Sequence, residues 1–225
     1  MSGENKFLIG IGVVTLLVVA VGIFFFSSKQ SVQKVDNSPF DKAQLIDGAK
    51  HFKGDPGAPV TIVEFGDLQC PACQAAQPIV RKIEEKYSQN IYFVFRHYPL
   101  TIHKNSEIAA KASEAAGDQG KFFEMVDLMY TNQNEWAQDV NPRENFQKYA
   151  TQLGLNLDQF NQNMQKNWDN IKTDYALGNR AGVQSTPTFF INGEKYPGVV
   201  DEGQFQQIIE GIVPTQEPVK QTPEK

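Results

Sequence analysis

Cys70 and Cys73 are the only cysteines in this chain of 225 residues, and only Pro71 and Ala72 stand between them. This spacing is too short for a disulfide that clamps distant loops. Two thiols cannot complete a four-thiolate zinc site, and the three histidines show no ligand spacing relative to them. The pair therefore indicates thiol:disulfide exchange, with no metal and no cofactor. Two small buried side chains, or half of a metal site, are the plainer alternatives.

The place of the pair in the chain predicts a different role for each thiol. A predicted strand ends just before Cys70, and a predicted helix starts there, so Cys73 follows one turn later. Free amides and the positive end of the helix dipole stabilise a thiolate at this position. Pro71 suits the first helical turn, where its missing N–H has no partner to lose. Cys70 is the expected nucleophile, and Cys73 the thiol that resolves a mixed disulfide.

Glu64 is the nearest acidic residue inside the strand before the pair. On the two-residue period of a strand it shares a face with Val60 and Ile62, which are apolar. A carboxyl group on that face has a raised pKa and can exchange a proton with the cysteines. The alternative is that Glu64 reaches solvent at the strand end.

A proline also stands at the entry of a later apolar segment, where Thr186 and Pro187 precede residues 188–191. Proline at the start of a core strand is unusual unless its peptide bond is cis or it opens an edge strand. The residues alone leave both forms open.

The elements that position these residues follow from the apolar pattern. Residues 60–65 and 91–98 are predicted strands around a helix at 71–87, which is the unit of a parallel sheet with a right-handed crossover. Helices without intervening strands then predict a helical subdomain inserted into the sheet. Further helices are expected at 106–116, 121–130, 142–153 (with Asn141 as cap), 158–178 and 203–212, and strands at 188–191 and 194–200 around an Asn192-Gly193 turn.

The start of the chain predicts a membrane helix. Residues 7–26 form an uncharged apolar run, which spans about 30 Å of hydrocarbon at about 1.5 Å per residue. No small-residue cleavage site follows, so we expect a retained signal anchor rather than a cleaved signal peptide. Residues 1–6 form a short flank, 27–43 a polar tether, 44–212 one domain and 213–225 a disordered proline-rich tail.

Overall composition excludes some classes of protein. A net charge of −5 and 40% hydrophobic residues describe an ordinary globular chain and argue against a phosphate-neutralising nucleic-acid binder. Other residues are expected to have structural roles. His97 and His103 are predicted to lie on the surface or to be hydrogen-bonded parts of the scaffold, and the Asn and Gln residues between 132 and 170 to be solvated. The apolar side chains of one predicted helix are expected to pack in the core rather than to line a peptide groove; they are Phe122, Phe123, Met125 and Met129.

Four segments together resemble the DsbA-like thiol:disulfide oxidoreductases. They are VEFGDLQCPAC, RHYPLTIH, AAGDQGKFFEM and GVQSTPTFFING, in that order, and the match covers residues 50–212. The resemblance implies an α/β thioredoxin-like fold with an inserted helical domain at about residues 101–180. It also implies that Cys70 is the nucleophile, Cys73 the resolving cysteine and Glu64 the buried acid. Thr186 and Pro187 would form a cis-proline loop that binds substrate backbone.

One residue departs from the family pattern. The best-known strong oxidase of the family has Pro-His between its cysteines, where this chain has Pro71 and Ala72. An alanine side chain cannot donate to the thiolate, which would make the pair a weaker oxidant.

We therefore expect a membrane-anchored enzyme outside the cytoplasm that exchanges disulfides with cysteines of exported proteins, and the resemblance implies that it acts as an oxidase. It also implies a quinone-linked membrane thiol oxidase as the partner that reoxidises the pair. A disulfide reductase or isomerase is an open alternative, as is a redox-silent holdase or a thiol-based copper carrier. The placement outside the cytoplasm rests on this chemistry, because the lysines flanking residues 7–26 do not favour export.

Overall fold

The computed structural model describes residues 40–166 and 168–213. The expected flank, membrane helix and most of the tether precede these residues, and the expected tail follows them apart from Val213. Within the described ranges, no helix combines the length and apolarity needed to cross a membrane.

A five-stranded mixed sheet forms the centre of the described part, in the order β1-β3-β2-β4-β5. The strands are β1 (His51–Gly54), β2 (Val60–Gly66), β3 (Ile91–His97), β4 (Thr188–Ile191) and β5 (Glu194–Pro197). β2 and β3 are parallel, as the strand-helix-strand pattern predicted, and the other neighbouring pairs are antiparallel. The register sets Glu64 of β2 beside Phe95 of β3 and Phe189 of β4.

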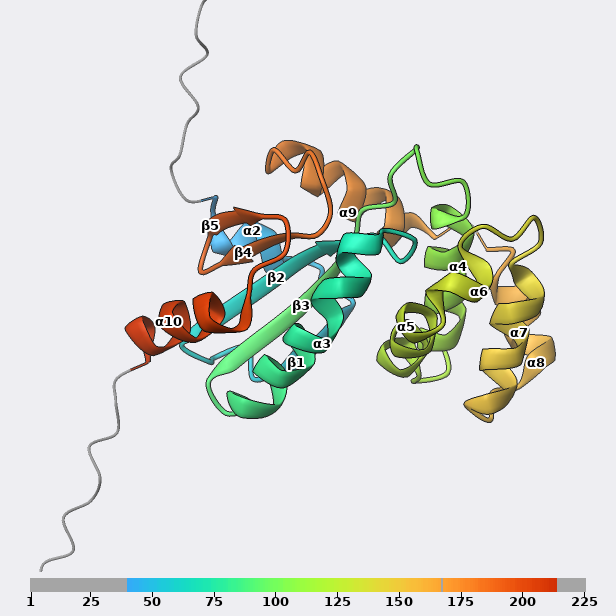
Figure 1. The fold of residues 1–225 in the computed structure, drawn as a ribbon, viewed down its shortest axis with the longest axis horizontal. Coiled ribbons are helices and arrows are strands. Elements are labelled where there is room, and N and C mark those ends of the chain that lie inside the picture. The colour runs from blue at the N-terminus through green and yellow to red at the C-terminus, as the bar shows by residue number, and fades with distance from the viewer. Residues whose placement is uncertain (1–39, 167, 214–225) are drawn as a thin grey trace, which may run out of the picture. The chain divides into compact units, whose positions relative to one another are not determined.

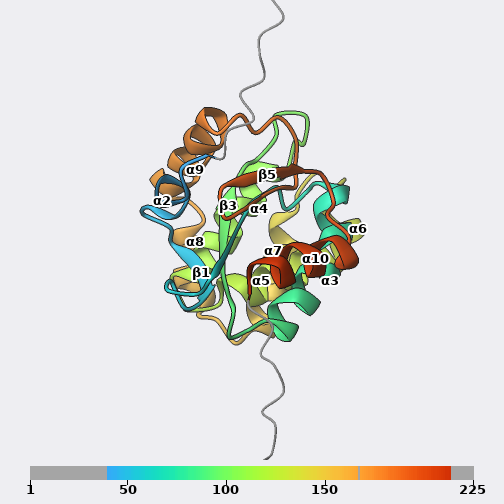
Figure 2. The same cartoon turned by 90° about the vertical axis from the view of Figure 1, so that its left-hand side faces the viewer.

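Helices cover both faces of the sheet. α3 (Pro71–Lys86) and α10 (Glu202–Ile212) pack together on one face, whereas α2 (Lys42–Ile46) and α9 (Asp169–Arg180) lie on the other, as Figure 2 shows. The side chains of β2 alternate accordingly. Val60 and Ile62 belong to the core under α3 and α10, and Val63 and Phe65 to the core under α9. This alternation puts Glu64 on the α3 side, together with the cysteines.

The remaining helices form a separate group beyond one end of the sheet (Figure 1). They are α4 (Ser106–Gly117), α5 (Phe122–Thr131), α6 (Gln133–Trp136), α7 (Arg143–Gln152) and α8 (Leu157–Asn163). The inserted helical subdomain is thus confirmed. The subdomain ends before the expected residue 180, because α9 packs on a face of the sheet against β3 and so belongs with the sheet rather than with the inserted helices.

Several predicted boundaries were wrong. The helix expected over residues 158–178 is two helices, α8 and α9, separated by a turn after Asn163. Asn141 does not cap α7; Pro142 holds the cap position, and the Asn141 amide bonds Glu144 instead. The last strand ends at Pro197 rather than at residue 200, and Lys42, placed in the tether, begins α2.

Candidate active site

Cys70 and Cys73 lie where β2 passes into α3, and both are free thiols. Cys70 is the N-cap residue of α3, and Pro71 begins the helix, as expected. Cys70 keeps 6% of its surface exposed, whereas Cys73 keeps none. Only the first sulfur is therefore within reach of a protein substrate.

The surroundings drive the pKa values of the two thiols apart. A hydrogen bond with Cys73, helped by Thr186 and by the amides of Cys73 and Ala72, outweighs burial and lowers the pKa of Cys70 to about 5. Burial raises the pKa of Cys73 well above its ordinary value, and the bond to Cys70 adds to this rise. At neutral pH Cys70 is a thiolate and Cys73 a thiol, which is the division of roles that a nucleophile and a resolving cysteine require.

Glu64 is buried beside the pair, with 1% of its surface exposed. Desolvation, with smaller contributions from Glu84 and Cys70, raises its pKa to about 8. One of its oxygens, Oε2, has no hydrogen-bond partner among the described residues. The prediction of a buried acid on the apolar face is confirmed in position. A neutral carboxyl group with a free oxygen can give a proton to a sulfur and take it back.

Thr186 and Pro187 face the pair from the other side of the site. Their peptide bond is cis, and the Cys70 thiol donates to the Thr186 carbonyl at 3.2 Å. The Thr186 hydroxyl is buried and has no partner among the described residues. Once Cys70 is ionised it can no longer donate, and this hydroxyl is then available as a donor to the thiolate.

The sequence did not predict two residues that hold the Cys70 loop in place. This loop consists of residues 67–70, between β2 and α3. Gln133, interpreted as solvated, is buried, and its amide donates to the carbonyls of Leu68 and Cys70 at 2.8 and 3.1 Å. Asp67 was not singled out, although its buried carboxylate accepts four hydrogen bonds. One of those donors is His103, which confirms the scaffold interpretation of that histidine. Apart from the Gln69 amide, the partners of both residues lie far away in the sequence, so local pattern carries little signal for them.

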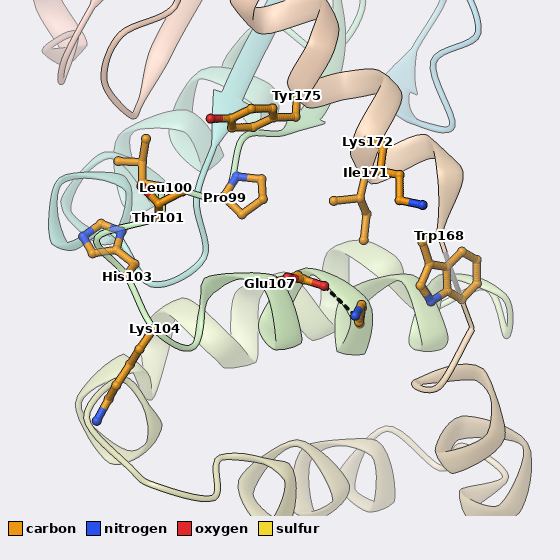
Figure 3. A pocket seen from close by; sticks show the side chains of 11 residues that line it. Pro99, Leu100, Thr101, His103, Lys104, Glu107, Trp168, Ile171, Lys172 and Tyr175 are labelled. Carbon is orange, nitrogen blue, oxygen red and sulfur yellow. Dashed lines mark ion pairs between the residues drawn. The ribbon is translucent and has the colours of Figure 1, made fainter.

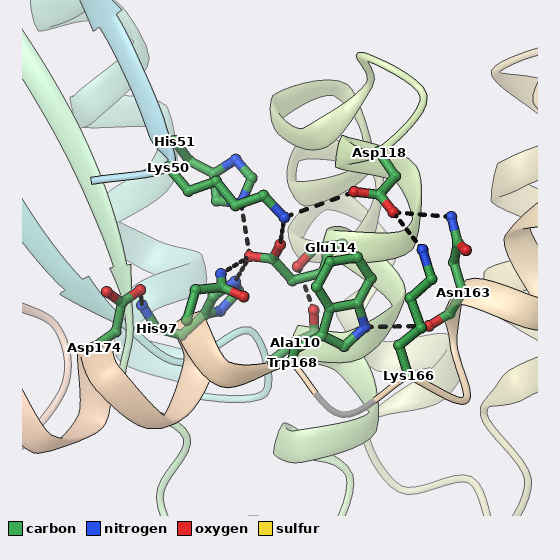
Figure 4. Close-up of polar contacts among 12 residues, drawn as sticks. Lys50, His51, His97, Ala110, Glu114, Asp118, Asn163, Lys166, Trp168 and Asp174 are labelled. Carbon is green, nitrogen blue, oxygen red and sulfur yellow. Dashed lines mark hydrogen bonds and ion pairs between the residues drawn. The ribbon is translucent and has the colours of Figure 1, made fainter. Parts of the chain in front are cut away.

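A second buried polar cluster joins α4 to the sheet (Figure 4). Glu114 Oε1 lies 2.6 Å from His51 Nε2, 3.1 Å from His97 Nε2 and 2.6 Å from the Asn170 amide, and Lys50 donates to Oε2 at 2.8 Å. The two imidazoles and the carboxylate are within 4.8 Å of one another, a donor set that a divalent ion can use. In this structure the carboxylate accepts from these four donors, three at Oε1 and one at Oε2. We interpret the cluster as a hydrogen-bonded joint, in keeping with the scaffold role expected of His97.

A cavity of about 510 Å³ opens between α4, α9 and the segment that follows β3 (Figure 3). Pro99, Leu100, Ile171 and Tyr175 supply apolar lining, and His103 lines it as well. The apolar side chains of α5 do not line this cavity. Phe122, Met125 and Met129 are buried in the core and Phe123 packs against it partly exposed, so the prediction that the four pack in the core is confirmed for three of them.

Comparison with known proteins identifies relatives of both the sequence and the fold. A family model described as Thioredoxin matches residues 47–211. A thioredoxin-like oxidoreductase from Silicibacter pomeroyi superposes with a TM-score of 0.66 at 25% identity, over 76% of this chain and 96% of that one. α-DsbA1 of Wolbachia pipientis gives 0.65 at 26% identity (74% and 92%), and oxidised BdbD of Bacillus subtilis gives 0.62 at 25% (71% and 90%).

The curated relatives carry a different name. A protein of Salinispora arenicola named Na⁺/H⁺ antiporter NhaA 1 is 41% identical over 151 residues, which are 66% of this chain and 22% of that protein. The chain thus spans about a fifth of the length of this relative.

Proposed function

Because the chain belongs to the thioredoxin family, we propose that it is a thiol:disulfide oxidoreductase that oxidises cysteine pairs of exported proteins. The observation that carries the proposal is the opposite displacement of two thiol pKa values at the start of α3, downward for Cys70 and upward for Cys73. A Cys70 thiolate with a pKa of about 5 stabilises the reduced form of the pair. A pair whose reduced form is stabilised accepts electrons readily, and this favours oxidation of substrates over their reduction.

The reaction starts from the Cys70–Cys73 disulfide. A substrate thiolate attacks Cys70 Sγ; the new substrate–Cys70 bond forms as the bond to Cys73 breaks, and Cys73 leaves with the electron pair. Glu64 gives its proton to this buried sulfur, because a thiolate is disfavoured there. A second substrate thiolate then attacks the substrate sulfur of the mixed disulfide and releases Cys70 as a thiolate. Two electrons pass to the pair, and the substrate gains one disulfide.

Ala72 does not prevent this chemistry. Its side chain has no donor, but its backbone amide contributes to lowering the Cys70 pKa, as does that of Cys73. Thr186 supplies a further contribution from across the site. Donors of the helix N-terminus and of the cis-proline loop therefore act where another chain could use a histidine.

Segments that are hydrogen-bonded to the residues before Cys70 carry apolar side chains that an unfolded or extended substrate could contact. Two exposed apolar side chains, Ile102 at 82% and Val140 at 95%, lie in segments tied to the Cys70 loop. Leu100 N–H donates to Asp67, and Gln69 Nε2 donates to the carbonyl of Ala137. Apolar side chains at such positions can contact exposed apolar segments of a substrate before its disulfide is formed.

We extend the proposal to location and partner. Residues 7–26 would anchor the domain in the membrane with its catalytic part outside the cytoplasm, where disulfides persist. A quinone-linked membrane thiol oxidase would reoxidise the pair, and the shared membrane would raise the rate of their encounter. The ion exchange named for the curated relatives is not part of the proposal, since the chain spans about a fifth of the first of them.

Disulfide transfer to a reduced two-cysteine substrate tests the function. The oxidised protein should yield one substrate disulfide per pair reduced, and Cys70→Ser should be inactive. Cys73→Ser has no disulfide to transfer; its Cys70 thiolate should instead attack a substrate that already carries a disulfide and accumulate as the mixed disulfide. A protein that leaves the substrate thiols unchanged but reshuffles a wrongly paired substrate disulfide is an isomerase or reductase. Suppression of substrate aggregation that survives Cys70→Ser identifies a holdase. Stoichiometric binding of copper(I) that needs both thiols, without disulfide transfer, identifies a carrier.

A further inference from the structure

Asp67 lies between the end of β2 and Cys70, and the proposed exchange steps make no use of it. Its side chain is almost wholly buried, with 1% of the residue surface exposed. A buried carboxylate is unfavourable unless hydrogen bonds replace its hydration. Its partners therefore show what it holds in place.

Each carboxylate oxygen of Asp67 accepts two hydrogen bonds. Oδ1 accepts from the Gln69 amide at 2.9 Å and from the Ser106 hydroxyl at 2.6 Å. Oδ2 accepts from the Leu100 amide at 3.0 Å and lies 2.6 Å from His103 Nδ1. One donor belongs to the Cys70 loop and three belong to residues 100–106, so the carboxylate fastens the loop to the segment between β3 and α4.

The backbone of Asp67 contacts both cysteines. Its carbonyl accepts the Cys70 N–H at 3.0 Å and the Tyr130 hydroxyl at 3.4 Å. Its own amide bonds Cys73 and lowers the pKa of that thiol against the effect of burial. A shift of this one residue would therefore move the turn that carries Cys70 and change a donor to Cys73.

A second brace runs beside the first. Gln69 Oε1 accepts from the Asn105 amide at 2.6 Å, and Gln69 Nε2 donates to the Ala137 carbonyl at 2.5 Å. His103 is the only side-chain ring among the four donors to Asp67, and 18% of its side chain is exposed. It lines the cavity of Figure 3, where a substitution is tolerated more easily than at the buried aspartate.

We propose that Asp67 is a positioning residue of the redox pair, which holds the Cys70 turn against the segment after β3 through its bonds to His103, Leu100 and Ser106. The proposal rests on the proposed function and adds a residue that tunes it. Asp67 does not contact the substrate sulfur. It acts by keeping the backbone amides of α3 aimed at Cys70, on which the thiolate depends.

The substitution Asp67→Asn changes the charge and the hydrogen-bonding groups of the side chain but keeps its size. The new amide would keep one accepting oxygen but would present an NH₂ group to donors such as the Leu100 amide, which then lose their acceptor. Asp67→Asn should raise the Cys70 pKa by about one unit and slow Cys70 alkylation about fivefold at pH 5, because less of the thiol is then ionised. Since the reduced form loses stabilisation, the reduction potential should fall by about 30 mV for each tenfold change in the equilibrium constant.

Two His103 variants keep the proposal testable if Asp67→Asn does not fold. His103→Ala removes one donor and should shift the Cys70 pKa in the same direction by a smaller amount. His103→Asn places an amide N–H where Nδ1 stands and should restore the wild-type value. A role of His103 as an acid or a charge would not be rescued by asparagine.

Asp174→Asn is the matched control. Asp174 is a buried aspartate, 4% exposed, that accepts from Arg96 at 2.8 Å and from the His97 amide at 3.1 Å, without contact to the cysteines. The substitution should lower stability and leave the Cys70 pKa unchanged. The measurement is the pH dependence of Cys70 alkylation, together with the potential, in full-length protein.

The proposal is overturned if folded Asp67→Asn and His103→Ala both keep the wild-type Cys70 pKa and potential, or if Asp174→Asn shifts them equally. These results differ from failure of the proposed function, in which the wild-type pair itself transfers no disulfide.

Discussion

At the scale of single residues, two identical side chains acquire opposite properties from their surroundings. Cys70 lies at the start of α3 among hydrogen-bond donors, and its pKa falls to about 5. Cys73 is one turn deeper, without exposed surface, and burial raises its pKa. In the proposed exchange, this difference makes Cys70 the sulfur that leaves the mixed disulfide as a thiolate, and Cys73 the sulfur that takes up a proton.

The Cys70 pKa predicts a pH profile for alkylation of the reduced protein. The rate with iodoacetamide should follow a single ionisation with a midpoint near pH 5 and be flat between about pH 7 and pH 8. Cys70→Ser should abolish this phase, and Cys73→Ser should raise its midpoint, because the hydrogen bond with Cys73 is the largest cause of the lowering. A midpoint near the ordinary value of about 8.5 would contradict the site geometry.

Glu64→Gln should stabilise the protein while it slows exchange. The folded-state pKa of about 8 lies above the unfolded value, so the carboxyl group contributes stability fully only below pH 4.5, and this contribution is lost as the pH rises through 8. At about pH 7 the uncharged glutamine should therefore increase the free energy of unfolding, measured in urea, by up to about 3 kcal/mol. Single-turnover disulfide transfer should fall about tenfold, because glutamine cannot supply the proton. Equal stability of both proteins at neutral pH would refute the assignment of a buried acid.

At the scale of elements, a buried cluster of polar side chains attaches the inserted helices to the sheet. Glu114 on α4 receives bonds from β1, β3 and α9 through His51, His97 and Asn170. These bonds hold the pKa of the Glu114 carboxyl well below its usual range, against the opposing effect of burial. The stabilisation is thus present above the unfolded pKa of about 4.5 and disappears as the pH falls through the folded one.

Glu114→Ala should lower the free energy of unfolding by about 3 kcal/mol or more, because it leaves buried donors without an acceptor. The matched control is Glu107→Ala on the same helix, whose carboxylate is 70% exposed and pairs with Lys111. That change should cost less than about 1 kcal/mol. Urea unfolding at neutral pH makes the comparison, and similar losses for the two variants would show that the Glu114 cluster is not a joint.

The main elements could be predicted because their signals are local. The β-branched run of β2, the Asn192-Gly193 turn and the helical spacing of α3 each dictate one structure. β1 was not predicted because its sequence, HFKG, has no apolar alternation. It is a strand because it pairs with β3 at the edge of the sheet. The break between α8 and α9 was not predicted because no glycine or proline lies between these two helices.

The residues of the candidate site fall into the same two groups, those with a local sequence signal and those without one. Cys70, Cys73, Glu64 and the cis-proline pair were predictable because spacing, alternation or the resemblance places them. Asp67 and Gln133 were not, because all their side-chain partners except the Gln69 amide come from residues 33 to 65 positions away. Sequence shows that such residues are polar, whereas only the fold shows that they are buried and bonded to the redox loop.

At the scale of the whole molecule, we propose that the apolar N-terminal run holds the redox domain at the outer face of a membrane. In intact cells, after mild reduction, a membrane-impermeant thiol reagent should label Cys70. Labelling that needs cell lysis would place the domain in the cytoplasm. Deletion of residues 1–26 should move the protein from the membrane fraction to the soluble fraction, and its unchanged sedimentation would exclude an anchor there.

The reduction potential of the Cys70–Cys73 pair, measured by equilibration of the soluble domain with glutathione, tests the central claim most directly. The stabilised Cys70 thiolate predicts an oxidising couple, nearer to about −120 mV than to about −270 mV. A value near the lower figure would contradict the oxidase and support a reductant. The absence of any reversible two-electron couple would contradict the enzyme altogether.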